Sequence, residues 1–252
     1  LSALSNGLRL VILGNAAQAI VAMSLHPPHV ADGKRALGLT MFGVTTPAVT
    51  AMVEALKTTY EPLVFHATGT GGKTMEMLVD SGLITGVLDI TTTEVCDLLV
   101  GGVLAAGEDR LDCIARTKVP YVGSLGACDM VNFWAPETVP ERFADRTFYN
   151  HNANVTLMRT SVDECRAIGE WIGGKLDICS GPIRFLIPEK GVSALDIEGG
   201  PFWLPEADTA LFGALERTLR PAPNRKIMRM PLHINDPRFA AAAVAAFTEI
   251  AN

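Results

Sequence analysis

The chain has 252 residues, enough for one large or two small domains, and its 48% hydrophobic and 19% charged residues are typical of a well-packed globular protein. Its net charge of −6, without a large basic cluster, argues against nucleic acid and acidic membrane surfaces as partners. The five cysteines include no CxxC pair, which argues against a disulfide framework or a cysteine-rich metal site. Because no signal peptide and no apolar run of membrane-spanning length is recognised, we expect a cytoplasmic protein without a bound metal.

The first 35 residues are predicted to be a lead-in helix and a proline linker. Residues 8–23 are apolar and rich in alanine, which favours a helix packed on a partner or on another domain. Pro27 and Pro28 end it, because proline cannot continue a helix. The chain also begins without Met, so we expect it to be part of a longer protein.

Residues 36–252 are predicted to form a single α/β domain, because strand and helix patterns alternate along them. Ser161 with Glu164, and Asp236 followed by Pro237, are typical of helix N-termini. The predicted strands cover residues 37–42, 63–65, 86–90, 119–122, 183–187 and 227–230, and the predicted helices begin near residues 48, 75, 95, 109, 162, 207 and 238. This alternation predicts a mostly parallel sheet of about six strands with helices on both faces, a Rossmann-like or doubly wound arrangement.

The turns that follow these strands carry the candidate ligand-binding residues. Right-handed crossovers place the carboxyl ends of parallel strands at one edge of the sheet, and ligands bind outside that edge. Turns and helix caps also favour Ser, Thr, Asp and Gly for structural reasons, so capping is the alternative for each of these residues. The candidates are Thr45, Thr46, Thr68, Gly69, Thr70, Gly71, Gly72, Asp89, Thr91, Thr92, Ser124 and Asn152.

The stretch from Leu63 to Glu76 carries the most specific pattern, an apolar strand followed by a glycine-rich turn and a helix. Glycines allow a ligand to approach the backbone closely, and the helix N-terminus attracts an anion. Residues 72–74, Gly-Lys-Thr, match the end of a P-loop, but Ala67 stands in place of its first glycine. A small anionic ligand is therefore favoured here over a P-loop ATPase, and a tight turn shaped by packing alone is the other alternative.

Two histidines are candidate catalytic residues. His66 directly ends the apolar strand, and His151 lies between asparagines in the polar run 149–154, which follows a predicted long loop at residues 136–146. If the two side chains converge, one could act as a general acid or base near neutral pH. Structural roles in the core or in a loop are equally open for both histidines. A serine-nucleophile pattern of the GxSxG type is absent, and Cys128 is favoured to be an inert buried thiol.

Several longer strings together resemble one family, the uncharacterised family typified by the tomato mosaic virus resistance protein and labelled as an ATP-binding domain. They are residues 38–47, 64–72, 89–94, 148–152, 155–160, 199–202 and 233–237. The resemblance implies that this chain is the second α/β lobe of a two-lobed protein whose N-terminal lobe is missing. It also implies that ATP binds somewhere in the full-length protein.

Three functions follow as hypotheses. The first is a lobe that helps to form a cleft for a nucleotide or another small anionic ligand, within a longer protein that is a homodimer. The second is an enzyme that acts on a small carboxylated or phosphorylated metabolite through His66 and His151. The third is a scaffold or interaction lobe without a ligand of its own.

Overall fold

The computed structural model describes residues 2–25 and 33–251, which divide into two compact units, residues 1–34 and 35–252. The first unit contains helix α1 (Ser2–Leu25), and the predicted proline linker lies outside the described residues. From Leu10 to Leu25 the side chains of α1 are exposed, including eight large apolar ones. Within the described ranges, no helix is long and apolar enough to cross a membrane.

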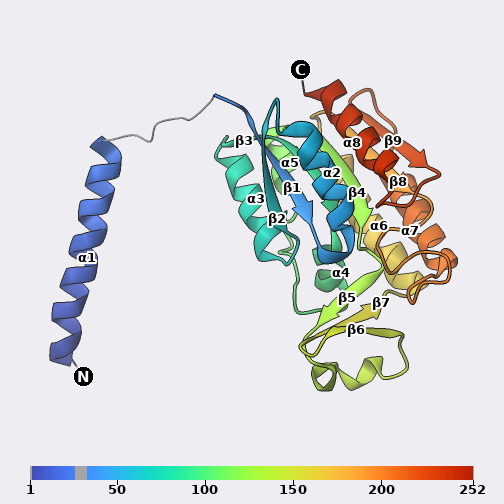
Figure 1. Cartoon of the computed structure of the whole chain (residues 1–252), viewed down its shortest axis with the longest axis horizontal. Helices are drawn as coiled ribbons and strands as arrows, with labels where there is room; N and C mark the ends of the chain where they lie inside the picture. Colours follow the sequence, from blue (N-terminus) through green and yellow to red (C-terminus); the bar gives the residue numbers. More distant parts are fainter. Residues whose placement is uncertain (1, 26–32, 252) are drawn as a thin grey trace. The chain divides into compact units, whose positions relative to one another are not determined.

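The second unit is built on a six-stranded, fully parallel sheet with the strand order β2-β1-β3-β4-β8-β9 (Figure 1). This confirms the predicted α/β architecture. Strand order reverses between β1 and β3, because the chain adds β2 on one side of β1 and every later strand on the other. The strands are β1 (Ala36–Met41), β2 (Glu61–His66), β3 (Ile84–Thr91), β4 (Tyr121–Gly126), β8 (Ile183–Pro188) and β9 (Arg225–Met230).

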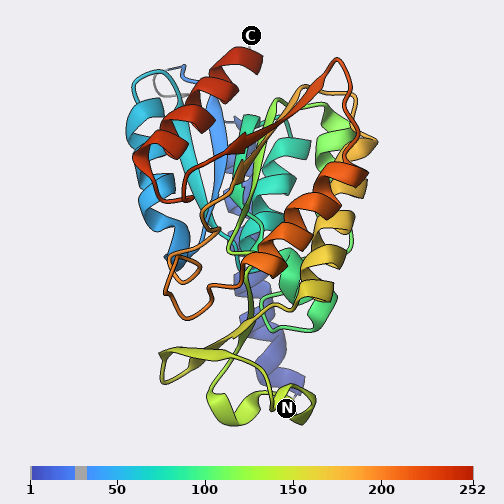
Figure 2. The ribbon, with the colours of Figure 1, turned by 90° about the vertical axis from the view of Figure 1, so that its right-hand side faces the viewer.

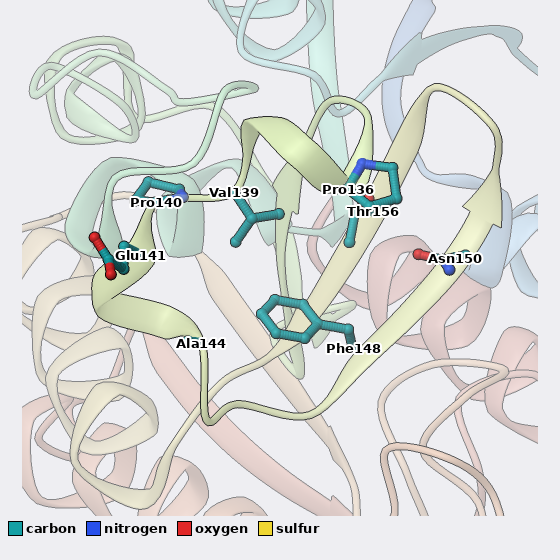
Figure 3. Close-up of a pocket in the computed structure, with 8 residues that line it drawn as sticks. All are labelled: Pro136, Val139, Pro140, Glu141, Ala144, Phe148, Asn150 and Thr156. Atoms are coloured by element: carbon teal, nitrogen blue, oxygen red, sulfur yellow. The ribbon is translucent and has the colours of Figure 1, made fainter.

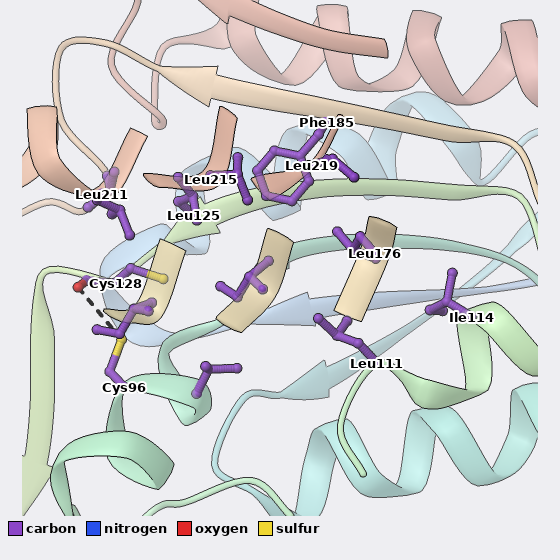
Figure 4. Packing of buried hydrophobic residues seen from close by; sticks show 14 of the residues in the cluster. Cys96, Leu111, Ile114, Leu125, Cys128, Leu176, Phe185, Leu211, Leu215 and Leu219 are labelled. Carbon is purple, nitrogen blue, oxygen red and sulfur yellow. Dashed lines mark hydrogen bonds between the residues drawn. The ribbon is translucent and has the colours of Figure 1, made fainter. Parts of the chain in front are cut away.

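Helices cover both faces of this sheet (Figure 2). Helices α2 (Thr46–Leu56) and α8 (Pro237–Ile250) pack together on one face, over a core that includes Leu39, Leu88 and Phe247. The other face carries α3 (Thr70–Asp80), α4 (Thr93–Val100), α5 (Asp112–Thr117), α6 (Val162–Asp177) and α7 (Pro205–Thr218). Their core is the larger one, and Figure 4 shows Leu125, Phe185 and Leu215 among its side chains.

A second, three-stranded antiparallel sheet projects beyond the carboxyl ends of the parallel strands (Figures 1 and 2), and the sequence patterns did not predict it. Its strands are β5 (Met130–Phe133), β6 (Phe148–Asn152) and β7 (Val155–Arg159), in the order β5-β7-β6. The polar run at residues 149–154 is the β6–β7 hairpin, in which Asn152 Oδ1 accepts a hydrogen bond from Asn154 N. The predicted long loop contains two 3-10 turns, η2 (Pro136–Thr138) and η3 (Glu141–Phe143).

The helix signals in the sequence correspond to observed caps. Ser161 and Glu164 form a capping box at the start of α6, and the Asp236 carboxylate accepts from Arg238 N at the start of α8. Helix α2 begins at Thr46, two residues before the predicted start near residue 48.

Asp97 links helix α4, which covers the main sheet, to the small antiparallel sheet. Its buried carboxylate accepts hydrogen bonds from Leu104 N (2.7 Å), Asn132 N (2.8 Å) and Asn132 Nδ2 (3.1 Å). Asn132 lies in β5, so one side chain fixes both the loop after α4 and the first strand of the small sheet.

We expect Asp97→Ala to lower the free energy of unfolding by roughly 3 kcal/mol, because it leaves buried N–H donors without acceptors. Urea unfolding measures this change, and amide exchange at Asn132 should accelerate with it. Asp163→Ala, at a side chain that is 88% exposed, is the control and should have little effect. Equal stabilities of the two variants would contradict the role given to Asp97.

Candidate functional site

At the carboxyl edge of the sheet, buried hydrogen bonds connect β1 and β3, the two strands between which the strand order reverses. Thr40 Oγ1 donates to Asp89 Oδ1 (2.7 Å) and accepts from Thr91 N (3.0 Å), which joins β1 to β3. Thr45 Oγ1 lies 2.8 Å from Thr91 Oγ1 and also bonds to the backbone of Phe42. Three of the predicted site residues, Thr45, Asp89 and Thr91, therefore meet in one buried network.

Beneath this edge lies the Arg110 cluster, which consists of Arg110, Glu76, Asp89 and Glu94. The guanidinium is only 2% exposed and donates to all three carboxylates, with Nη1–Glu76 Oε1 and Nε–Glu94 Oε1 distances of 2.6 Å and an Nη2–Asp89 Oδ1 distance of 2.9 Å. Tyr121 completes the shell by donating its hydroxyl to Asp89 Oδ2 (3.1 Å). Arg110 thus connects α3, β3 and α4, and Asp89 extends the cluster to β4 through Tyr121.

The pKa values of the residues in this cluster depend on one another. Burial alone would lower the pKa of Arg110, but Asp89, Glu94 and Glu76 together hold it well above its ordinary value. Burial raises the pKa of Glu76, and the nearby Arg110 opposes that shift. Because a buried charge is costly without its partners, the arginine and its carboxylates stabilise the fold only as a set.

The glycine-rich turn is built around a carboxylate from the protein itself. Gly69 N donates to Glu94 Oε2 at 2.7 Å. A Cβ at Gly72 would lie 1.8 Å from Glu94 Oε1, and one at Gly71 would lie 1.8 Å from the carbonyl oxygen of His66. The close backbone approach that the glycines allow is therefore used by Glu94 and His66. In this structure Glu94 supplies the negative charge expected at the start of α3.

His66 is exposed at the same edge, and its ring stacks on Phe42 with centroids 5.2 Å apart and an interplanar angle of 15°. Partial burial lowers the pKa of His66, which favours the neutral imidazole. His151 is exposed on β6, and within the described part of the chain it makes no side-chain hydrogen bond and no ring contact with His66. The acid–base pair of the second hypothesis therefore stays a prediction.

The remaining predicted site residues divide by exposure. Thr92 and Ser124 are fully buried, with Thr92 Oγ1 donating to Ser124 O (3.2 Å) and Ser124 Oγ to Leu186 O (2.8 Å). Thr46 is half-buried and donates to Phe42 O at 3.3 Å. The residues that solvent reaches in full or in part at the edge are Thr46, His66, Thr68, Gly69, Thr70 and Gly71, while Asn152 is exposed on the hairpin.

A second buried ionic group, the Arg159 cluster, consists of Arg159, Asp129, Ser193, Asp196 and Asp208. Arg159 Nη2 donates to Asp208 Oδ1 at 2.7 Å and lies 3.9 Å from Asp196 Oδ1, while Ser193 Oγ donates to Asp129 Oδ2 at 2.7 Å. Asp129 Oδ1 and Asp196 Oδ1 are buried and have no hydrogen-bond partner among the described residues. Burial raises the pKa of Asp129 and of Asp196 to about 6, and that of Asp208 to about 7.

Sequence patterns did not reveal the roles of Arg110 and Arg159. Their carboxylate partners are distant in the chain, and the pairs follow no short spacing. In the ranges that the structure describes, no group of three or more His, Cys, Asp or Glu residues is arranged to hold a metal ion.

We expect Arg110→Met to lower the free energy of unfolding by about 3–5 kcal/mol, because three carboxylates then lose their buried counter-charge. Chemical denaturation measures the loss. Arg116→Met is the control, since Arg116 pairs with Asp80 at the surface with 58% of its side chain exposed and should matter little. A stability of Arg110→Met equal to that of the control would refute the organising role of the cluster.

The Arg159 cluster predicts a pH dependence. The ordinary pKa of an aspartate is 3.8, and that of Asp208 is raised to about 7 in the folded protein. Between these pH values the folded protein keeps the proton that the unfolded chain loses, so the free energy of unfolding falls as pH rises through that window. Across the whole window the fall that Asp208 contributes to the free energy of unfolding is on the order of 4 kcal/mol. Asp208→Asn should therefore flatten the fall in stability between pH 5 and 7.5. The control Glu206→Gln, at an exposed position of the same helix turn, should keep the wild-type slope. Identical slopes in Asp208→Asn and wild type would contradict this assignment.

Comparison with known proteins shows the family to which this chain belongs. Residues 34–251 match the C-terminal domain of the uncharacterised protein family UPF0261. A UPF0261 protein of Mesorhizobium japonicum is 68% identical over 246 residues, which is 98% of this chain and 62% of that protein. The ToMV resistance protein Tm-1(GCR237) of Solanum lycopersicum is 46% identical over 252 residues, or 97% of this chain and 33% of that protein.

Among solved structures, the esterase domain from a Rhodothermus marinus protein is similar with a TM-score of 0.41 and 12% identity, over 86% of this chain and 87% of that one. The chain spans about three fifths of the length of the bacterial relative. The resemblance found in the sequence is confirmed, and the chain belongs to the UPF0261 family, with residues 34–251 forming its C-terminal domain.

Proposed function

We propose that this C-terminal domain forms one wall of a cleft that binds a small anionic ligand, with a nucleotide as the first candidate. The ligand site is centred on the β1–α2 turn, residues 43–46, beside His66. The observation that carries the proposal is the reversal of strand order between β1 and β3, because doubly wound sheets bind ligands outside the carboxyl ends at such a point.

The anion could bind at the β1–α2 turn or at the β2–α3 turn. The groups that already occupy each turn favour the β1–α2 turn. The β2–α3 turn already holds the carboxylate of Glu94. In contrast, none of residues 43–46 bonds to a carboxylate among the described residues. A Cβ added at Gly43 would meet no described atom within 4 Å, so the approach to this turn is open. The positive end of the α2 dipole and the half-buried hydroxyl of Thr46 then favour a phosphate.

His66 supports a ligand that carries a ring as well as a charge. Phe42 stacks on one face of its imidazole, and the exposed part of the neutral ring is suited to stack on an aromatic base. The ATP label implied by the family resemblance agrees with this chemistry.

The other wall of the cleft is proposed to come from the part of the full-length protein that is absent from this chain. Helix α1 precedes the matched C-terminal domain and exposes large apolar side chains from Leu10 to Leu25, as expected of a helix that normally packs inside a domain. We therefore assign α1 to the core of the preceding lobe. All five cysteines are free and buried, which supports a cytoplasmic location, and the homodimer stays a prediction.

Gly43→Ala tests the proposed site. The added methyl group meets no described atom within 4 Å, so folding should be unaffected while the approach of a phosphate is blocked. We expect the affinity for ATP, measured by titration calorimetry on this chain and on the full-length protein, to fall at least tenfold. Gly174→Ala is the matched control, because its Cβ makes only an ordinary contact of 3.9 Å with Thr218, on a helix away from the carboxyl edge.

Two results would contradict the proposal. If neither form of the protein releases heat with ATP, ADP or pyrophosphate, the domain has no such ligand. If Gly43→Ala binds ATP as tightly as Gly174→Ala does, the site lies elsewhere. Lys73→Ala distinguishes the P-loop alternative, which requires a large loss of affinity at that exposed lysine.

A further inference from the structure

A pocket of about 330 Å³ lies between the small antiparallel sheet and the loop that crosses it (Figure 3). Strands β6 and β7 form its floor, and the two 3-10 turns η2 and η3 form its walls. Apolar groups dominate the lining, and Figure 3 shows Val139 and the ring of Phe148 facing each other across the space. The lining residues are Pro136, Val139, Pro140, Glu141, Ala144, Phe148, Asn150 and Thr156.

The pocket is not a gap beneath a loosely held loop, because two side chains of the loop, Phe143 and Arg146, anchor it to the rest of the domain. Phe143 is buried in the main core and its ring lies 5.6 Å from that of Phe133. Arg146 donates both Nη groups to the carboxylate of Glu164, at 2.9 and 2.6 Å, and a further bond to Arg159 O. The proline rings at 136 and 140 restrict the backbone that leads to these anchors. A preformed pocket of this kind loses little conformational entropy when a ligand binds.

Two polar groups on the floor of the pocket lack partners. Thr156 is 2% exposed, and its Oγ1 has no hydrogen-bond partner among the described residues. The Asn150 side chain, opposite Thr156 in the β6–β7 ladder, is exposed to solvent and makes no hydrogen bond to the part of the chain that the structure describes. Unpaired buried hydroxyls are rare because they cost free energy. A rotation of about 120° about the Cα–Cβ bond would place the Thr156 hydroxyl where its methyl group lies and turn the hydroxyl toward the pocket.

From these observations we propose that this pocket is a second binding site, specific for a small neutral molecule with one or two rings and a single hydrogen-bonding group. An apolar cavity of about 150 Å³ holds benzene, so twice that volume accommodates a substituted ring or a bicyclic molecule. The hydroxyl of Thr156 and the amide of Asn150 bind the polar end. Glu141 at the rim repels anions, which separates this site from the proposed phosphate site at the carboxyl edge.

Phenol, toluene and benzoate are the probes for this site, since they share a ring and differ in hydrogen bonding and charge. Methyl NMR of Val139 and Ala144 in the 252-residue chain should show saturable shifts with phenol in the millimolar range, weaker binding of toluene and the weakest binding of benzoate. Failure of phenol and toluene to saturate these signals would overturn the proposal. Tighter binding of benzoate than of phenol would overturn the assignment to neutral ligands.

Two variants locate the bound probe. Ala144→Phe fills the pocket and should abolish phenol binding, whereas Ala241→Phe, at an exposed position of α8, should leave it unchanged. Thr156→Val keeps the shape and removes an unpaired hydroxyl, so the protein should be as stable as wild type or slightly more stable. It should lower the affinity for phenol about fivefold and leave that for toluene unchanged. Phenol binding that survives Ala144→Phe would place the probe elsewhere and refute the site. An unchanged ratio of phenol to toluene affinities in Thr156→Val would refute the proposed hydrogen bond.

Discussion

A single buried guanidinium sets the geometry of the carboxyl edge. Arg110 binds carboxylates from α3, β3 and α4, and each of those carboxylates also accepts a bond from another element, such as Gly69 N on Glu94 or Tyr121 on Asp89. A charge in this position is stable only when all of its partners are present, since removing one leaves others buried without compensation. The turn after β2 and the start of α4 therefore have one joint arrangement rather than two independent ones.

This constraint decides which groups at the edge remain available to a ligand. Glu94 fills the glycine-rich turn, and Thr45, Thr91 and Asp89 bond to one another. Groups that bond within the protein hold the edge rigid, while His66 and the open approach at Gly43 lie at its surface. A rigid layer beneath a few accessible groups is the arrangement that binding sites require, because the supporting residues fix the orientation of those that contact the ligand.

Much of the fold could be predicted from the sequence, because apolar periodicity and helix caps are local signals. Ser161 and Asp236 cap the helices that their neighbours indicated, and the alternation of strands and helices predicted the parallel sheet. The small sheet could not be predicted, because β6 is short, polar and largely exposed. The role of Arg110 could not be predicted either, since its partners at positions 76, 89 and 94 are brought to it only by the folded sheet. A long-range contact also explains why the glycine-rich turn suggested an external anion. The anion that occupies the turn is the Glu94 carboxylate, which lies 25 residues away from Gly69 in the chain.

The most direct test of this account is a crystal structure of the full-length protein grown with ATP. We expect phosphate density at residues 43–46, a base near His66, and a Glu94 carboxylate still bonded to Gly69 N. Phosphates in the β2–α3 turn, with Glu94 displaced from Gly69, would contradict it and restore the glycine-rich turn as the anion site. Nucleotide bound entirely within the preceding lobe would also contradict it, and the carboxyl edge of this domain would then have no direct part in binding.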